Sequence, residues 1–309
     1  MKVKKWLLAL AAFAVMAVVC AVAAGAENFT YGDFEYGVLS DGTVEITDYN
    51  GSAETVDIPK KIDGKSVTRI GANAFEYCSN ITSITIPDSV TSIYSYAFRY
   101  CTSLKSITIP DGVTEICSYT FEHCTSLKSV TIPGSVTSIN GCAFSYCTSL
   151  TSITIPNSVT EIGSSAFSGC ANLTSITIPG SVTSIDKYTF SGCESLISVT
   201  IPGSVTSIDK YTFSGCESLI SVTIPSSVTE IGYNAFSGCT SLTSVTIPNS
   251  VTSIDSSTFG GCSSLTAINV ATENQNYVSV NGVLYNKDKT TIICYPAGKK
   301  MKIIRYLMK

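Results

Sequence analysis

Few residues in this sequence could transfer protons or bind a metal ion. His123 is the only histidine among 309 residues, and Cys124 follows it. A histidine that acts as a general base needs a second group to orient it, and no fixed constellation surrounds His123. A tetrahedral zinc site needs four ligands at recognisable spacing, which this pair does not supply. We therefore expect His123 to be an exposed turn residue, and we expect no catalytic residue, metal or cofactor.

The cysteines form the second group of chemically capable residues. Nine of the 13 cysteines are spaced by 23 residues, from Cys78 to Cys262. If successive units stack, their Cα atoms lie about 5 Å apart, within the range of a disulfide, so disulfides or a metal ladder are conceivable. Nine identical side chains that point the same way pair poorly and leave one over, which favours buried free thiols that act as small hydrophobic groups. Cys117 and Cys142 fall outside this spacing in adjacent units and are the best disulfide candidates.

The cysteine spacing is part of a repeat of the whole sequence. Nine Val-Thr pairs, from Val67 to Val251, lie 23 residues apart, and each is followed by an Ile. Phe comes eight residues after each Val, Cys three residues later, and then the pattern Leu-x-x-Ile-x-Ile with minor variation. Pro closes eight of the nine units, and Ala271 replaces it in the ninth. Periodicity of this kind is typical of solenoid proteins.

The elements of one unit follow from its residue types. Leu-x-x-Ile-x-Ile places alternate side chains inward on a short strand. Pro ends that strand because it has no N–H to donate, and the neighbouring Gly, Asn, Asp or Ser supplies a turn. We expect Val-Thr-x-Ile to start the opposite side of the coil, and Phe and Cys to lie in a tight helical turn with Phe pointing inward. One unit cannot bury its apolar face alone, so the nine coils must stack, with right-handed crossovers.

The unit from Leu150 to Cys170 resembles the BspA-type leucine-rich repeat, which is found in surface proteins of host-associated bacteria and some protozoa. The resemblance covers residues 67–271 fully. It differs from commoner leucine-rich repeats in that Cys precedes the strand. The resemblance implies a right-handed, β-rich leucine-rich-repeat solenoid of short parallel strands and short helical turns. It also implies adhesion and protein binding, with ligands that differ between members. Residues 181–203 and 204–226 are identical except at their last position, which suggests a recent duplication.

The two ends of the chain differ from the repeat. Residues 1–26 combine a basic start, an apolar run and small residues before Glu27, as in a cleaved signal peptide. We expect residues 27–66 to form an N-terminal β cap with a hairpin turn at Asp41-Gly42. Residues 272–309 are expected to form a C-terminal cap with a hairpin at Asn281-Gly282, followed by a basic tail from Lys299. Attachment to a membrane would be through the N-terminal segment alone, if it is not cleaved.

Tyrosines are concentrated in the first repeat units, within the expected helical-turn segment. Exposed Tyr is an effective contact residue because it offers a large area at a low entropy cost. Packing of the rings between neighbouring coils is the alternative explanation. The tyrosines that we expect to bind a partner are Tyr77, Tyr94, Tyr96, Tyr100, Tyr119, Tyr146, Tyr188 and Tyr211.

Charge and repeat pattern together limit the function. The net charge is −4, and it becomes −7 without the three Lys of residues 1–26, so no nucleic-acid partner is expected. The sequence contains no nucleophile–base set and no phosphate-binding loop, so we do not expect an enzyme. We expect a monomeric, secreted or cell-surface protein that binds an extracellular protein or glycoprotein in adhesion. The alternative is a structural coat or spacer protein without a specific ligand.

Overall fold

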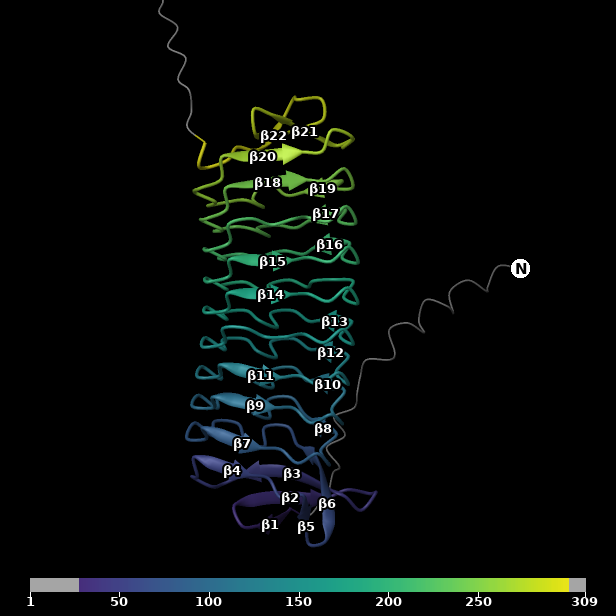
Figure 1. Cartoon of the computed structure of the whole chain (residues 1–309), viewed down its shortest axis with the longest axis vertical. Helices are drawn as coiled ribbons and strands as arrows, with labels where there is room; N and C mark the ends of the chain where they lie inside the picture. Colours follow the sequence, from purple (N-terminus) through teal and green to yellow (C-terminus); the bar gives the residue numbers. More distant parts are fainter. Residues whose placement is uncertain (1–27, 300–309) are drawn as a thin grey trace, which may run out of the picture.

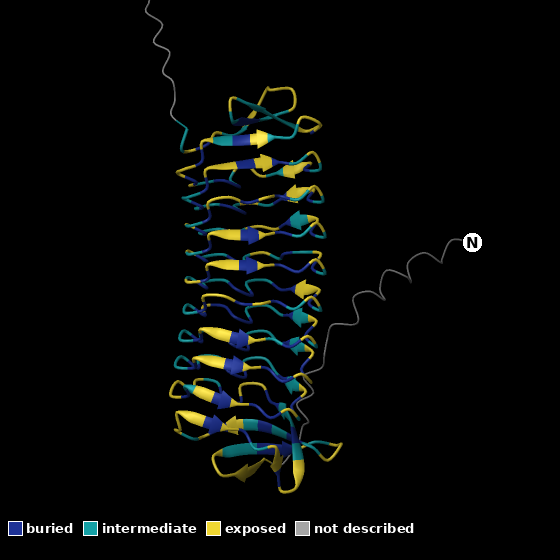
Figure 2. Ribbon diagram, in the orientation of Figure 1, coloured by how far each residue is buried: buried dark blue, intermediate teal, exposed yellow. Residues whose placement is uncertain are grey.

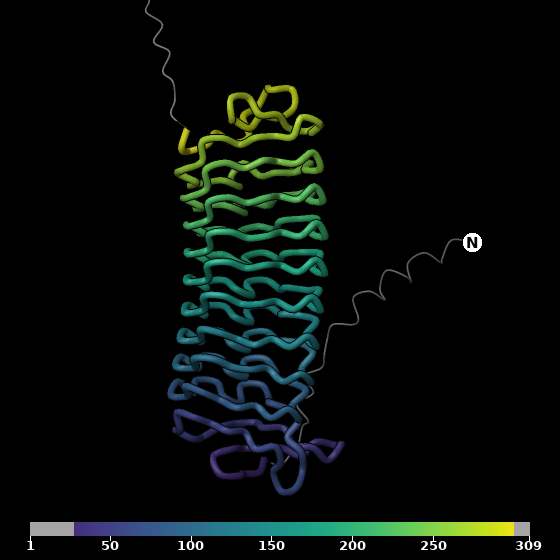
Figure 3. Tube along the Cα trace, viewed as in Figure 1, coloured from purple at the N-terminus to yellow at the C-terminus, as the bar shows by residue number. Residues whose placement is uncertain are grey.

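The computed structural model describes residues 28–299, which form a rod of stacked coils (Figures 1 and 3). The N-terminal segment closes one end of the rod, and the chain then advances by one coil for each 23-residue unit. The predicted leucine-rich-repeat solenoid is therefore confirmed. The predicted signal peptide and nearly all of the predicted basic tail lie outside the described residues.

One side of the rod, here called the strand face, carries the Ser-Ile-Thr or Ser-Val-Thr segments in parallel. Equivalent residues pair in register, as Ser106 does with Ser129. The central Ile or Val is buried, whereas Ser and Thr are exposed (Figure 2). The pairing is interrupted at residues 152–154 and 221–223. The strands of this face are β4 (Thr55–Asp57), β7 (Ser83–Thr85), β9 (Ser106–Thr108), β11 (Ser129–Thr131), β14 (Ser175–Thr177), β15 (Ser198–Thr200), β18 (Ser244–Ile247) and β20 (Ala267–Val270).

A second column of parallel strands contains the Ile of each Val-Thr-x-Ile segment. Most of these strands have two residues, and the Ile side chain points into the core. The column consists of β3 (Val44–Tyr49), β6 (Lys65–Ile70), β8 (Ser92–Ile93), β10 (Glu115–Ile116), β12 (Ser138–Ile139), β13 (Glu161–Ile162), β16 (Ser207–Ile208), β17 (Glu230–Ile231) and β19 (Ser253–Ile254).

The third side, here called the turn face, runs from residues 71–81 in the first coil to 255–265 in the ninth. Its hydrogen bonds span three residues, for example from Cys78 N–H to Phe75 O and from Ile81 N–H to Cys78 O. This is the spacing of a 3₁₀ turn, but the turns do not continue into a helix anywhere in residues 28–299.

Stacked phenylalanines fill the centre of the rod. Consecutive rings from Phe98 to Phe259 lie 5.3 to 5.7 Å apart and are nearly parallel. Tyr49 of the cap stacks on Phe75 at 5.3 Å and covers the N-terminal end of this column. The predicted inward position of Phe is confirmed, because these side chains are at most 3% exposed.

The periodic cysteines are buried beside the phenylalanines. From Cys101 to Cys262 each side chain is fully buried. Each thiol donates to the Phe carbonyl of the preceding coil, for example Cys101 Sγ to Phe75 O at 3.1 Å and Cys170 Sγ to Phe144 O at 3.2 Å. Our interpretation of these residues as core thiols is confirmed, since each thiol has a hydrogen-bond acceptor in an otherwise apolar environment.

The N-terminal cap joins the rod through both strand columns. β2 (Phe34–Val38) and β3 form the expected hairpin around Asp41-Gly42, and β1 (Phe29–Tyr31) pairs with β2. β3 continues the second column by pairing in parallel with β6, and β4 continues the strand face by pairing with β7. β5 (Lys61–Ile62) forms a small hairpin with β6.

The C-terminal cap donates hydrogen bonds to backbone carbonyl groups at the end of the last coil. β21 (Tyr277–Val280) and β22 (Val283–Asn286) form the expected hairpin at Asn281-Gly282, and β23 (Ile292–Cys294) pairs with β22. Asn274 is fully buried. Its amide donates to Pro248 O at 2.8 Å and to Val251 O at 3.1 Å. In the preceding coils a Ser hydroxyl of the next coil donates to the equivalent Val carbonyl, as Ser250 Oγ does to Val228 O, and Asn274 takes this role for Val251.

Replacing Asn274 with Ala should loosen the C-terminal end of the rod. The loss leaves Val251 O without this donor and leaves Pro248 O with only the longer bond from Val251 N–H at 3.4 Å. A buried unsatisfied group costs about 1–3 kcal/mol. Hydrogen exchange should accelerate in β18 to β20 and remain unchanged in the first coils. The exposed Asn276→Ala serves as the matched control. Unchanged exchange in β20 would contradict this role of Asn274.

The buried thiols should make the rod sensitive to alkaline pH. Burial raises the pKa of Cys170 and of Cys216 to about 12. An unfolded chain ionises its thiols near pH 8.5, so the stabilising effect is complete below about 8.5 and is lost as pH rises toward 12, by about 1.4 kcal/mol per unit for each thiol. The free energy of unfolding of Cys170→Ala, measured in reductant, should therefore fall less steeply between pH 9 and 11 than that of the parent. Equal slopes would contradict the prediction.

Candidate binding surface on the turn face

One backbone conformation recurs on the turn face and determines where its side chains point. The residue before each periodic Cys has a positive φ in all nine coils. This conformation directs the N–H along the rod, where it donates to the next coil, as in Tyr77 N–H to Arg99 O at 2.8 Å and Tyr146 N–H to Ser168 O at 2.7 Å. The left-handed conformation is therefore imposed by stacking, whichever side chain occupies the position.

The side chain at this position changes along the rod. The last five coils have Gly, from Gly169 to Gly261, which adopts positive φ without strain. The first four coils have Tyr77, Tyr100, His123 and Tyr146, with φ of 57 to 64°. An L-residue in this conformation costs roughly 1–2 kcal/mol. The four residues form three stacked pairs, and each pair returns about 0.5–1.5 kcal/mol, so stacking at most balances the strain and the exchange of Gly for aromatic residues brings no gain in stability. What differs between the two halves of the rod is the surface.

These four residues form a continuous stack, here called the outer aromatic column. Tyr77 lies 4.9 Å from Tyr100, and His123 lies 4.6 Å from both Tyr100 and Tyr146, with rings within 10° of parallel. The column stops at Gly169, where an added Cβ would lie 2.7 Å from the Tyr146 ring. At its other end, Tyr77 is 63% exposed.

A second aromatic column runs beside the first and is discontinuous. It also uses positive φ, and its pairs are Tyr96 with Tyr119 and Tyr188 with Tyr211, each 4.8 Å apart. Cys142 and Ser165 occupy the two coils between these pairs.

Arg99 lies between the two columns and links three coils. Its guanidinium carbon is 4.8 Å from the centre of the Tyr100 ring and 5.4 Å from that of Tyr96. It forms ion pairs with Glu76 at 3.1 Å and with Glu122 at 2.5 Å. Burial alone would lower the pKa of Arg99. The hydrogen bonds to these carboxylates outweigh burial and raise this pKa above its usual range. The guanidinium therefore stays charged and fixes the surface around it.

The structure brings together most of the tyrosines that the sequence singled out, but in separate groups. Tyr77, Tyr96, Tyr100, Tyr119 and Tyr146 share the first four coils, whereas Tyr188 and Tyr211 form a distant pair. Tyr94 is half-buried beside them and belongs to neither column. Both earlier explanations of the tyrosines have a structural basis, because the rings pack between coils and remain partly exposed. Their role in binding stays a prediction.

Two residues of this surface were not identified from the sequence. His123 was expected to be an exposed turn residue, and instead it is half-buried between two rings. Its 23-residue spacing from Tyr100 and Tyr146 was the available signal. Arg99 was overlooked because its partners Glu76 and Glu122 are also 23 residues away and become neighbours only when coils stack.

The predicted disulfide pair lies on adjacent coils of the turn face. Cys117 and Cys142 are both half-buried. The Cys142 side chain is hydrogen-bonded to the side chains of Tyr119 and Ser165, and burial raises the pKa of its thiol. The disulfide between Cys117 and Cys142 stays a prediction.

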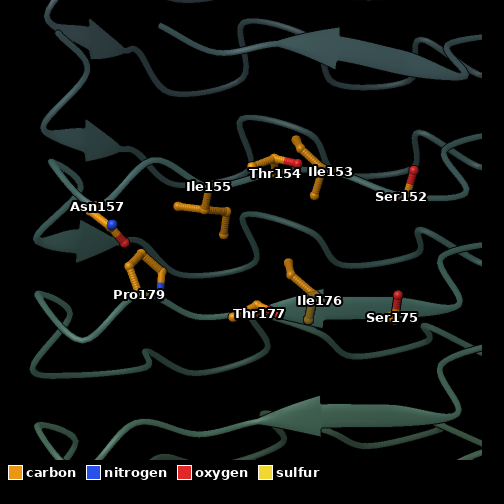
Figure 4. Close-up of a pocket in the computed structure, with 9 residues that line it drawn as sticks. All are labelled: Ser152, Ile153, Thr154, Ile155, Asn157, Ser175, Ile176, Thr177 and Pro179. Carbon is orange, nitrogen blue, oxygen red and sulfur yellow. The ribbon is translucent and has the colours of Figure 1, made fainter. Parts of the chain in front are cut away.

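Two shallow clefts open on the surface. One, of about 330 Å³, lies on the strand face where pairing is interrupted, between Ser152–Asn157 and Ser175–Pro179 (Figure 4). Its walls are hydroxyl, amide and aliphatic side chains, none of which titrates. The other, of about 350 Å³, lies between the N-terminal cap and the exposed end of the outer aromatic column. Asp48, Glu76 and Tyr77 contribute to its walls, so it combines carboxylates with an aromatic ring.

The arrangement is suited to contact with another molecule. Within residues 28–299 no group of three His, Cys, Asp or Glu side chains is placed to hold a metal ion. The same part of the chain has no helix with the length and apolarity needed to cross a bilayer. The turn face presents aromatic edges around a fixed cation, which are features of protein contact surfaces.

The coils and strand pairing define a leucine-rich-repeat protein. The model of the BspA type leucine rich repeat region matches residues 68–197 and 183–300, with six copies of the repeat. The chain belongs to this family, as the sequence had indicated. No curated protein sequence matches the chain.

The chain is also similar to solved structures. A leucine-rich repeat protein from Bacteroides ovatus is 31% identical, with a TM-score of 0.71, over 79% of this chain and 71% of its own. A leucine-rich repeat protein from T. pallidum is 28% identical, with a TM-score of 0.50, over 70% of this chain and 91% of its own. A protein from Faecalibacterium prausnitzii, described as a leucine rich cell surface protein, is 27% identical, with a TM-score of 0.41, over 80% and 95% of the two chains.

Replacing Arg99 with Gln should destabilise the first coils. Glu76 and Glu122 would lose their cation, and hydrogen bonds to charged groups contribute about 1.5–3 kcal/mol. Because the Arg99 side chain is 27% exposed, screening reduces this to about 1–2 kcal/mol. Urea unfolding of Arg99→Gln, Glu122→Gln and the double variant should give a coupling energy of about 1 kcal/mol. Strict additivity would contradict the proposed ion-pair network.

Proposed function

We propose that this chain is an exported binding protein of the cell surface or the extracellular space, and that it acts in adhesion or protein–protein interaction without catalysing a reaction. The partner is an extracellular protein or glycoprotein, and the contact surface is the turn face of the first four coils. The proposal extends the family assignment with features of this particular chain.

The observation that carries the proposal is the occupancy of the left-handed position in each coil. Glycine fits this position without strain, and the chain uses it in five coils. Four coils instead hold large aromatic residues whose edges are partly exposed. Since stacking only balances the backbone strain, stability does not account for the choice. Strained residues are concentrated at functional sites, which supports a binding role for this surface.

The chemistry of the surface supports contact with another macromolecule. Tyr and Arg are enriched where protein interfaces carry most of their binding energy. Here the rings are held in place by stacking and Arg99 by two carboxylates, so little side-chain entropy is lost on binding. The signal-peptide pattern of residues 1–26 supports export.

A coat or spacer role is the second candidate. The near-identical units 181–203 and 204–226 and the uniform Ser and Thr of the strand face favour it. In that case the rod has no specific partner and serves only as a spacer or as part of a surface coat.

Saturable binding separates these two functions. The purified protein would be tested against extracellular-matrix proteins, mucins and whole cells. The test variant replaces Tyr77, Tyr100, His123 and Tyr146 with Gly, the residue that the later coils use at this position, so the fold should be kept. We expect affinity to fall at least tenfold. The exposed Tyr233→Ser, in the eighth coil and therefore away from the first four, is the control and should bind as the parent does.

Two outcomes contradict the proposal. Equal affinity of the four-glycine variant and the parent would show that the turn face is not the contact surface. Absence of saturable binding by the parent to every component of the panel would favour the coat or spacer role.

A further inference from the structure

The outer aromatic column lacks a cover at its N-terminal end. The inner phenylalanine column ends on Tyr49, which stacks on Phe75 at 5.3 Å. By contrast, Tyr77 stacks on Tyr100 with one face, and no ring of the described residues lies against its other face. Tyr77 also lines the cleft of about 350 Å³ beside the cap. A planar group that entered this cleft would continue the stack by one further position.

The wall opposite the ring is held in place by close packing. It is formed by residues 48–53 of the cap. Tyr49 is buried beneath this segment, and its side chain is hydrogen-bonded to the backbone of Ala53. A Cβ at Gly51 would lie 2.3 Å from the Tyr49 hydroxyl, so only glycine allows this approach. The cleft is therefore a formed feature of the cap.

Charge favours a cation in this cleft. Asp48 and Glu76 line it, and Asn50, Ser79 and Asn80 add polar groups. Glu76 is already paired with Arg99 and accepts from Asn73, so Asp48 supplies the charge for an incoming cation. The surrounding cap also has an excess of acidic residues, because residues 28–66 contain eight Asp and Glu and three Lys. A negative surface attracts cationic partners and raises their local concentration.

The chain itself shows how a planar cation fits this surface. One coil away, the guanidinium of Arg99 packs against Tyr100 and pairs with carboxylates on either side. The cleft offers similar elements, namely the Tyr77 ring and the Asp48 carboxylate, for a group that comes from outside. Guanidinium also has the planarity to stack on an aromatic ring while its N–H groups reach carboxylate oxygens.

We propose that the cleft between the cap and Tyr77 binds an arginine side chain of a partner protein. The guanidinium stacks on the open face of Tyr77 and pairs with Asp48. This inference rests on the proposed binding function and specifies the chemistry of the partner, which is a basic, arginine-containing segment.

The test uses the purified protein and the blocked tripeptide Gly-Arg-Gly, with binding followed by ligand-observed NMR. Citrulline in place of Arg keeps the shape without the charge, and Lys keeps the charge without the planar group. We expect the Arg peptide to bind at least tenfold more tightly than either, and its affinity to decrease as salt is added. Tyr77→Gly and Asp48→Asn should each weaken binding at least tenfold. Tyr233→Ser is the control and should have no effect.

Several results would overturn the inference: no binding of the Arg peptide, equal binding of the citrulline or Lys peptide, or an unchanged affinity in Tyr77→Gly. Binding of neutral oligosaccharides at Tyr77 in place of the Arg peptide would also overturn it. Circular dichroism of each variant verifies the fold. If the peptide fails to bind but the four-glycine variant still loses its macromolecular partner, this inference is wrong and the proposed function stands. If the peptide binds and no macromolecule does, the proposed function is the one that fails.

Discussion

The hydrogen bond from one coil to the next is the constraint on which the remainder of this structure depends. On the turn face the residue before every periodic cysteine is left-handed, and in the first eight coils its N–H donates to the next coil. The inner side chains follow the same 23-residue step, so Phe stacks on Phe and each thiol reaches the carbonyl of the preceding coil. Seryl hydroxyls repeat the pattern, as in Ser158 Oγ to Val136 O at 2.6 Å. Interactions in such a rod are mainly between neighbours, so the caps must replace a missing neighbour at each end.

This constraint also explains why the surface can vary while the coil does not. The backbone fixes the conformation at the left-handed position but leaves the side chain open. Glycine satisfies the conformation, and an aromatic residue is held there by the rings above and below it. A change of surface from Gly169 to Tyr146 therefore requires no change in the path of the chain. The side chains of the turn face therefore differ between the first four coils and the last five.

Much of the fold could be predicted from the sequence because the 23-residue spacing shows which residues are equivalent in successive coils. Val67 and its equivalents, the inward Phe, the buried Cys and both hairpin turns were all predicted and confirmed. The candidate surface was predicted less completely. The sequence showed that tyrosines are concentrated in the first units, but not that His123 would stack between Tyr100 and Tyr146. It also did not indicate that Arg99 would find its partners, because those contacts join residues 23 positions apart. Backbone strain was equally invisible, since φ is a property of the stacked coil and not of one residue type.

The near-identical coils 181–203 and 204–226 lie between the outer aromatic column and the C-terminal cap. Their interfaces are interchangeable, so recombination between them can add or remove a coil without creating a new kind of contact. Each event would move the C-terminal cap by one strand spacing, about 4.8 Å, and leave the N-terminal cap and its cleft unchanged. The distance between the two ends of the rod is thus open to evolutionary adjustment independently of what the first four coils recognise.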